Sequence, residues 1–159
     1  MVKHIGFMVA IFAIALLVFY FGVSSESQWL ESLVITGPDI TLDEWRSLFS
    51  YWAAIGITIS VIAALLWFVL GQWVFRMNRW STANNKRSVW LMLGAVALAA
   101  ALPGIFLMPV VQEGGRLAWP FYLLNNLGVF YVSTLIFSPS SFKYTPLGGS
   151  FLWPLRQWW

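Results

Sequence analysis

Four stretches of the chain are apolar over lengths that suit a helix crossing a lipid bilayer. Such a helix needs about 20 consecutive apolar residues. The predicted spans are about 5–23, 51–74, 89–111 and 117–137. The first could also be read as a secretory signal peptide, but it is longer than the roughly 7–15 apolar residues that such peptides carry. The pattern therefore predicts an all-α protein, with a four-helix transmembrane bundle over 1–137 and a tail over 138–159.

The helix of the second span is expected to begin before the span itself. Thr41 and Glu44 have the spacing of a capping box, and Gly37-Pro38 supplies a break just upstream. A helix over 42–75 would be about 50 Å long at 1.5 Å per residue, which exceeds the hydrocarbon core. Its first two turns are therefore predicted to stand at the membrane interface.

The charged residues alternate in sign from one polar segment to the next. All six carboxylates fall after the first and third spans, together with two of the nine Lys and Arg. The other seven bases, and no acid, fall at the N-terminus, between the second and third spans, and in the tail. Segments rich in Lys and Arg stay on the cytoplasmic side of a membrane. The sorting predicts a multi-pass protein of a bacterial inner membrane with both termini in the cytoplasm.

Composition agrees with a membrane protein and narrows its chemistry. Hydrophobic residues make up 60% of the 159 and charged residues 9%, whereas a soluble domain is about a quarter charged. The net charge of +3 is split between two sides, which argues for anionic lipid headgroups as partners and against nucleic acid. The chain has no Cys, which excludes disulfides, thiolate metal sites and thiol nucleophiles.

Small residues recur at four-residue spacing along the spans, where they would let a neighbouring helix approach closely. The predicted packing residues are Gly6 and Ala10 on the first span, Gly56, Ser60 and Ala64 on the second, and Ala97 and Ala101 on the third. The sequence leaves open whether these faces pack within the chain or between subunits. Tryptophans gather near the predicted interfaces, and only Trp67 lies deeper, where it is expected to face a neighbouring helix.

Two further features interrupt the apolar spans. Pro103 should kink the third span, either as a structural adjustment or as a gate. Asn125 and Asn126 are the most polar pair inside the predicted bundle. They are expected to bond across helices, most simply to Ser60, Thr58 or a freed carbonyl, with contact to a substrate or ion as the alternative.

Catalytic signatures are sparse. No Asp, Glu, Lys, Arg or His lies between the ends of a predicted span, although coupled carriers and motors usually have such a group at depth. His4 is the only histidine and cannot form a zinc site alone. Asp43 and Glu44 suit the positive end of a helix dipole. The sequence predicts no catalytic residue, no metal and no cofactor, and therefore not an enzyme.

Basic and aromatic residues dominate the predicted cytoplasmic side. Cations between the second and third spans suit anionic lipid or an acidic partner, and the aromatic tail suits an extended segment ordered by a partner protein. The predicted lipid- or partner-binding residues are Arg76, Arg79, Lys86, Arg87, Phe142, Tyr144, Trp153, Trp158 and Trp159.

These features favour a non-catalytic structural or accessory subunit of a multi-protein inner-membrane complex of the secretion, motor or defence type. Its partners would be membrane lipids and other membrane subunits or copies of itself. The alternative is a small homo-oligomeric transporter or channel that uses Asn125, Asn126 and the kink at Pro103. A membrane lipid enzyme with Asp39 or Glu44 as its acid comes third, because helix capping already accounts for such carboxylates.

Overall fold

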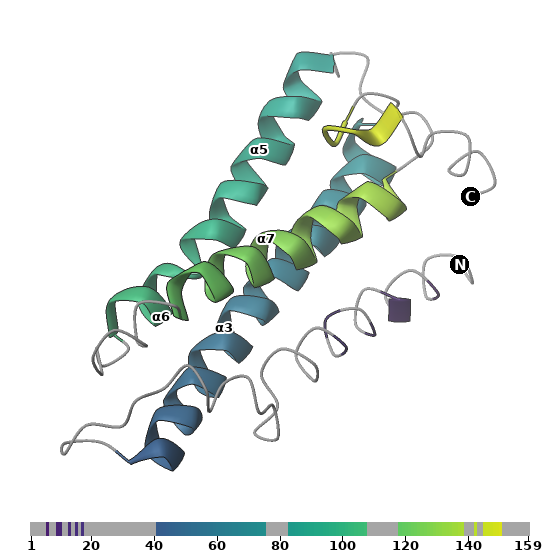
Figure 1. Ribbon diagram of the computed structural model, residues 1–159. Helices are drawn as coiled ribbons and strands as arrows, with labels where there is room; N and C mark the ends of the chain where they lie inside the picture. The colour runs from purple at the N-terminus through teal and green to yellow at the C-terminus, as the bar shows by residue number, and fades with distance from the viewer. Residues whose placement is uncertain are drawn as a thin grey trace.

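In the computed structural model, every regular element of the part that is described is a helix (Figure 1). The structure describes residues 41–75, 83–107, 118–138, 142 and 145–150, and the single positions Gly6, Val9, Ala10, Ala13, Ala15 and Leu17. The elements are α3 (Leu42–Val69), η1 (Leu70–Val74), α5 (Ala83–Ala99), α6 (Leu102–Leu107) and α7 (Ala118–Phe137). The predicted all-α class is confirmed at this level.

Two helical segments are long and apolar enough to cross a membrane, Asp43–Val69 and Asn84–Leu107. They correspond to the predicted second and third spans. The apolar part of α7, Pro120–Ile136, is shorter. Only single positions of the first predicted span are described, so the four-span count and the placement of the termini stay predictions.

A reciprocal pair of hydrogen bonds begins α3. The Glu44 N–H donates to Thr41 Oγ1 at 3.3 Å, and the Thr41 N–H donates to Glu44 Oε2 at 3.0 Å. The Glu44 carboxylate accepts hydrogen bonds from the Thr41 N–H and from the Thr41 hydroxyl. These bonds, the backbone one having the larger effect, hold the pKa of Glu44 below its usual value. The predicted capping box is confirmed. The helix also continues to Phe75 as predicted, but its last turn, η1, widens into a π-helix.

The third predicted span breaks where the sequence predicts a kink. Ala100 and Ala101 form a turn between α5 and α6, and the Ala101 N–H bonds to the Leu98 carbonyl at 3.0 Å. Pro103 follows directly. Because Pro has no N–H and its ring collides with the carbonyl four residues earlier, a regular α-helix cannot pass through this point.

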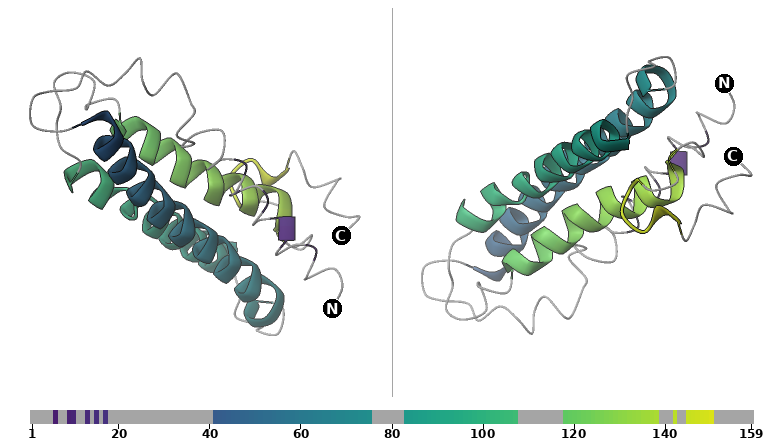
Figure 2. Two further views of the ribbon diagram at one scale, coloured as in Figure 1. Left: turned by 90° about the horizontal axis from the view of Figure 1, so that it is seen from below. Right: turned by 90° about the horizontal axis from the view of Figure 1, so that it is seen from above.

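Three helices pack around one another, and their contacts fix their directions. Trp67 near the end of α3 bonds to Ser138 just after α7, and Phe49 near the start of α3 contacts Tyr122 near the start of α7. The two helices therefore run in parallel. Trp90 in α5 bonds to Thr134, late in α7, and Gly94, farther along α5, lies against Phe130, earlier in α7. Helix α5 is therefore antiparallel to both. Figures 1 and 2 show this arrangement from three directions.

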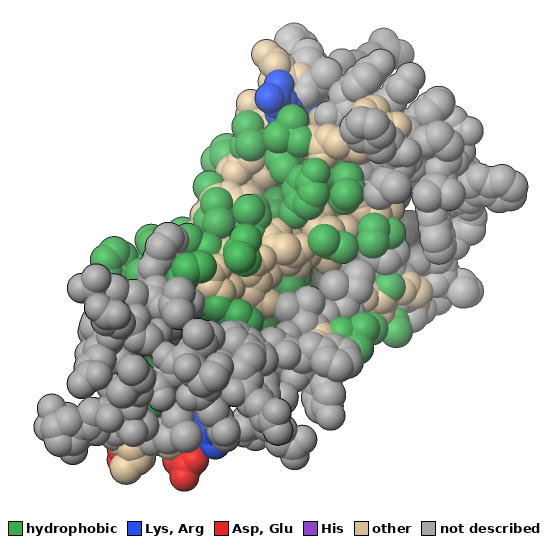
Figure 3. All heavy atoms as spheres, viewed as in Figure 1, with side chains coloured by type: hydrophobic (Ala, Val, Ile, Leu, Met, Phe, Trp, Pro, Cys, Tyr) green, Lys and Arg blue, Asp and Glu red, His purple; other side chains and the backbone are tan. Residues whose placement is uncertain are grey.

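Charged side chains mark the two ends of the bundle. We call the end with Asp43 and Glu44 the acidic end and the end with Lys86 and Arg87 the basic end. In Figure 3 the acidic side chains lie at one end of the visible face with a basic side chain beside them, other basic side chains lie at the opposite end, and apolar side chains lie between the two ends. Only 33% of the apolar window in Asn84–Leu107 is buried within the protein, so most of this surface faces outward.

Candidate interaction sites

The small-residue face of α3 packs within the chain. Ser60 and Ala64 are buried, and Gly56 lies directly against the side chain of Asn126 on α7. A Cβ at Gly56 would stand 2.5 Å from Asn126 Nδ2 and 2.7 Å from Oδ1. Only a glycine leaves room for the amide at this point.

The small residues of the other spans differ in exposure from one helix face to another. Ala97 and Ala101 are buried in the core, whereas Ala95 and Ala99 on α5 point outward. On the first predicted span, Gly6 is exposed and Ala10 is half-buried. The packing predicted for Gly6 and Ala10 stays a prediction.

Asn125 and Asn126 are buried as predicted, but the partners suggested from the sequence do not bond them. The Ser60 hydroxyl donates to the Gly56 carbonyl at 2.9 Å, and the Thr58 hydroxyl donates to the Ala54 carbonyl at 2.8 Å. Short hydroxyl side chains readily bond the carbonyl four residues back in their own helix. No amide nitrogen or oxygen of either asparagine has a hydrogen-bond partner.

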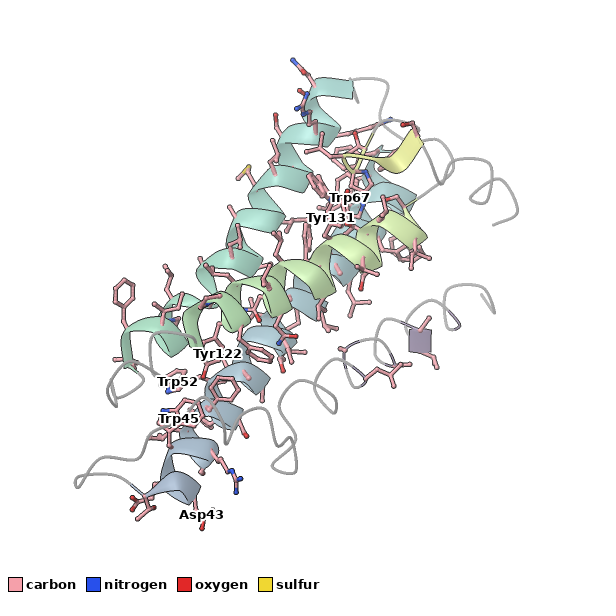
Figure 4. All side chains as sticks on the ribbon, in the orientation of Figure 1. Asp43, Trp45, Trp52, Trp67, Tyr122 and Tyr131 are labelled. Carbon is pink, nitrogen blue, oxygen red and sulfur yellow. The ribbon has the colours of Figure 1, made fainter. Side chains whose placement is uncertain are left out.

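Indole and hydroxyl groups connect the three helices at the basic end. Trp67 Nε1 donates to Ser138 Oγ at 2.9 Å, and Ser138 Oγ donates to the Thr134 carbonyl. Trp90 Nε1 donates to Thr134 Oγ1 at 3.0 Å. Trp67 is 1% exposed, and Figure 4 shows it toward the basic end of the bundle. The prediction that Trp67 faces a neighbouring helix is confirmed.

The first part of the tail folds onto this basic end. The Phe142 ring packs against Trp67 and Phe75, with centroids 5.4 Å and 5.9 Å away, and is 3% exposed. Lys86 Nζ lies 4.5 Å from the centroid of the same ring. The ring of Phe142 is therefore covered by its own bundle, and the lipid- or partner-binding role predicted for this residue stays a prediction.

Residues 145–150 continue this contact (yellow in Figure 1). Tyr131 Oη donates to the Leu147 carbonyl at 2.7 Å. Gly148 follows with φ +78°, a conformation that suits glycine, and a Cβ there would lie 3.1 Å from Tyr131 Oη. The tail therefore begins as an ordered cap on the bundle.

The other predicted binding residues have different positions. Arg87 is exposed at the start of α5. The remaining cations and tail aromatics lie outside the described residues: Arg76, Arg79, Tyr144, Trp153, Trp158 and Trp159. Their predicted role in lipid or partner binding stays a prediction.

Aromatic packing closes the acidic end. Tyr122 Oη donates to the Phe49 carbonyl at 3.1 Å, and Gly104 lies under the Tyr122 ring. Trp45 stacks on Phe49 with ring centroids 5.0 Å apart. Figure 4 shows Trp45, Trp52 and Tyr122 gathered here, with Asp43 farther out at the start of α3.

The acidic side chains of this end make local contacts. Asp43 pairs with Arg46 at 3.5 Å, and its side chain is 93% exposed. Glu44 caps α3. Within the described ranges, no group of three or more His, Cys, Asp or Glu side chains is placed to hold a metal ion.

Sequence reasoning did not single out the hydroxyl groups that join the helices. Tyr122, Tyr131, Thr134 and Ser138 all come from α7 or the residue after it, and all four donate or accept bonds to other parts of the fold. Tyr131, Thr134 and Ser138 recur at intervals of three and four residues, a helical signal that could have identified these three.

Comparisons with known proteins identify no family for this chain. Family models, curated proteins and solved structures give no match to the chain.

Proposed function

We propose that this protein is a non-catalytic accessory subunit of a multi-protein complex in a bacterial inner membrane. The chain would cross the membrane four times, with the basic end and both termini on the cytoplasmic side. Lipids and other membrane subunits would cover its outward faces.

The main support is the apolar outer surface of the two long helices. Large apolar side chains project outward along them, including Ile62 (50% exposed), Met92 (69%) and Phe106 (77%). A water-soluble protein rarely exposes so much contiguous apolar surface, and a bilayer covers it at no cost.

One end of the bundle carries Asp43 and Glu44 on α3, with Arg46 beside them, and the other carries Lys86 and Arg87 on α5. This distribution supports the proposed orientation.

The packing inside the chain limits the surfaces that remain for partners to bind. The small-residue face with Gly56, Ser60 and Ala64 is used within the chain, and Phe142 is covered by the bundle. Partner contacts are therefore proposed for the outward faces of α5 and α6 and for the aromatic tail beyond Ser150. In this arrangement, the cap formed by Phe142 and residues 145–150 would hold the start of that tail against the bundle.

Two truncations of a tagged full-length chain test this function. Ending the chain after Ser150 keeps the cap, whereas ending it after Phe137 also removes Ser138 and Phe142. Extraction in mild detergent should recover specific membrane partners with the full chain. The Ser150 truncation should lose them while keeping the melting temperature of the full chain. A lone 18.0 kDa monomer, or an unchanged set of partners after truncation at Ser150, would count against the proposal.

A second candidate, a small homo-oligomeric channel, has one specific observation in its favour. The polar atoms of Asn125 and Asn126 inside the bundle have no protein partner, as expected of groups that meet a passing solute. If the chain is such a channel, changing both residues to Leu in reconstituted vesicles should abolish solute flux. Unchanged flux would remove this candidate.

A further inference from the structure

The middle of α7 holds several polar atoms that no protein group satisfies. Asn125 is 6% exposed and Asn126 and Ser133 are fully buried. Both amide groups and the Ser133 hydroxyl lack a hydrogen-bond partner. Asn126 and Ser133 lie two turns apart, so they share one side of the helix.

The opposite helix, α3, gives these polar atoms no hydrogen bonds. The Asn126 amide occupies the space beside Gly56, because glycine has no side chain. The nearest hydroxyl on that face, Ser60, already donates to the Gly56 carbonyl. Backbone groups inside α3 are engaged in their own helix.

Leaving so many buried polar atoms unsatisfied costs a large share of the stability of a typical domain. Lipid tails cannot supply hydrogen bonds. An ion would need an opposite charge nearby, and the described part of the bundle interior has no ionisable acid or base beside these residues. The missing partner must therefore be small, uncharged, and able both to donate and to accept hydrogen bonds.

We propose that water binds inside the bundle between α3 and α7, with Asn125 and Asn126 at one site and Ser133, about 10 Å farther along α7, at another. Water is the smallest molecule with the required chemistry, and buried water commonly satisfies groups of this kind. The amide atoms are covered in the present packing, so water enters when the middle of α7 moves away from Gly56.

The bonds at the two ends of α7 favour this local opening. Tyr122 is bonded to the Phe49 carbonyl near one end, and Ser138 is bonded to Trp67 at the other. These two points lie about 24 Å apart at 1.5 Å per residue. The ends stay attached to α3 while the segment between them, which has no such bond, separates.

Magnetisation transfer from water to side-chain N–H groups tests the proposal in the full chain, labelled with nitrogen-15 and embedded in lipid nanodiscs. The side-chain amides of Asn125 and Asn126 should receive transfer from water. Asn84, exposed at the basic end, is the positive control. The Trp67 indole, bonded to Ser138, is the negative control. If the two amides behave like the Trp67 indole, the proposal is wrong.

Two variants test whether Asn125 and Asn126 share the same water. Asn126→Leu keeps the branching of the side chain and removes its polar atoms, and it should reduce the transfer to Asn125 several-fold. Ser133→Ala is the control, because Ser133 lies about 10 Å from Asn126 along the helix, and it should leave the transfer to both amides unchanged. The signal of Asn84 should stay constant in both. Full transfer to Asn125 in the Asn126→Leu variant would overturn the shared site.

Discussion

The basic end and the middle of the bundle both bury polar residues of the α7 segment, with opposite results. At the basic end, Thr134 and Ser138 meet indole N–H groups from Trp90 and Trp67. In the middle, Asn126 meets the bare backbone of Gly56. The difference lies in the opposing helices, which present hydrogen-bond donors in one place and a glycine without a side chain in the other.

This contrast separates two uses of buried polarity. Satisfied polar groups fix the geometry of a core, whereas unsatisfied ones destabilise the packing that covers them. We therefore expect a firm basic end, which holds the start of the tail, and an adaptable middle, which takes up water.

Loss of the Phe142 ring should have the largest effect. Its burial against Trp67 and Phe75 predicts that Phe142→Ala lowers the free energy of unfolding by about 3 kcal/mol. Unfolding in mixed detergent micelles measures this change. Phe106→Ala is the matched control, because that ring is 77% exposed, and it should have little effect. Equal effects would show that the cap contributes nothing to the bundle.

Gly56→Ala should disturb the middle. The new methyl group would collide with the Asn126 amide, and such overpacking costs about 1–3 kcal/mol. Adding Asn126→Ala should restore most of the lost stability, because the amide would no longer occupy the space beside Gly56. The same assay measures the free energy of unfolding of the three variants. If the losses of the two single variants add up in the double variant, Gly56 and the Asn126 amide are not in contact.

Trp67→Phe isolates one hydrogen bond of the basic end. The ring contacts remain while the bond to Ser138 Oγ is lost, so we expect a loss of about 1 kcal/mol. Trp73→Phe is the control, since that indole is 69% exposed, and its unfolding free energy should stay within about 0.5 kcal/mol of the unchanged chain. A similar loss of unfolding free energy in both variants would show that the bond between Trp67 and Ser138 has no specific role.

The smallest effect concerns the capping box at the acidic end. The bonds from Thr41 lower the pKa of Glu44 in the folded chain. Their stabilisation is therefore present above the unfolded pKa of Glu44 and is lost as the pH falls through the folded pKa. Amide exchange in the first turn of α3 should rise over that range, and Glu44→Gln should remove the dependence. Exchange around Asn126 should not follow this titration.

Local signals in the sequence predicted the ends and breaks of helices. The pair Thr41 and Glu44 marks the start of α3, and Pro103 marks the break before α6, because each acts through neighbouring residues alone. The same reasoning placed Trp67 against another helix, since a deep indole needs a partner.

The partners of buried groups could not be read from the sequence in this way. Ser60 was a reasonable partner for the asparagines, but its hydroxyl bonds to its own helix. Phe142 was expected to meet another protein, yet it meets Phe75, 67 residues earlier in the chain. Such contacts depend on the rotation of each helix about its axis, and the all-round apolar character of membrane spans does not specify that rotation.

In the proposed topology, the bundle crosses a membrane with its basic end in the cytoplasm and its acidic end outside. Because the natural chain has no Cys, single replacements allow a direct test: Asp43→Cys, Asn84→Cys and Ser150→Cys, each treated in intact cells with a membrane-impermeant maleimide. Asp43→Cys should react at once, whereas the other two should react only after the membrane is permeabilised. Labelling of positions 84 and 150 from opposite faces would contradict the topology together with the contact between Lys86 and Phe142.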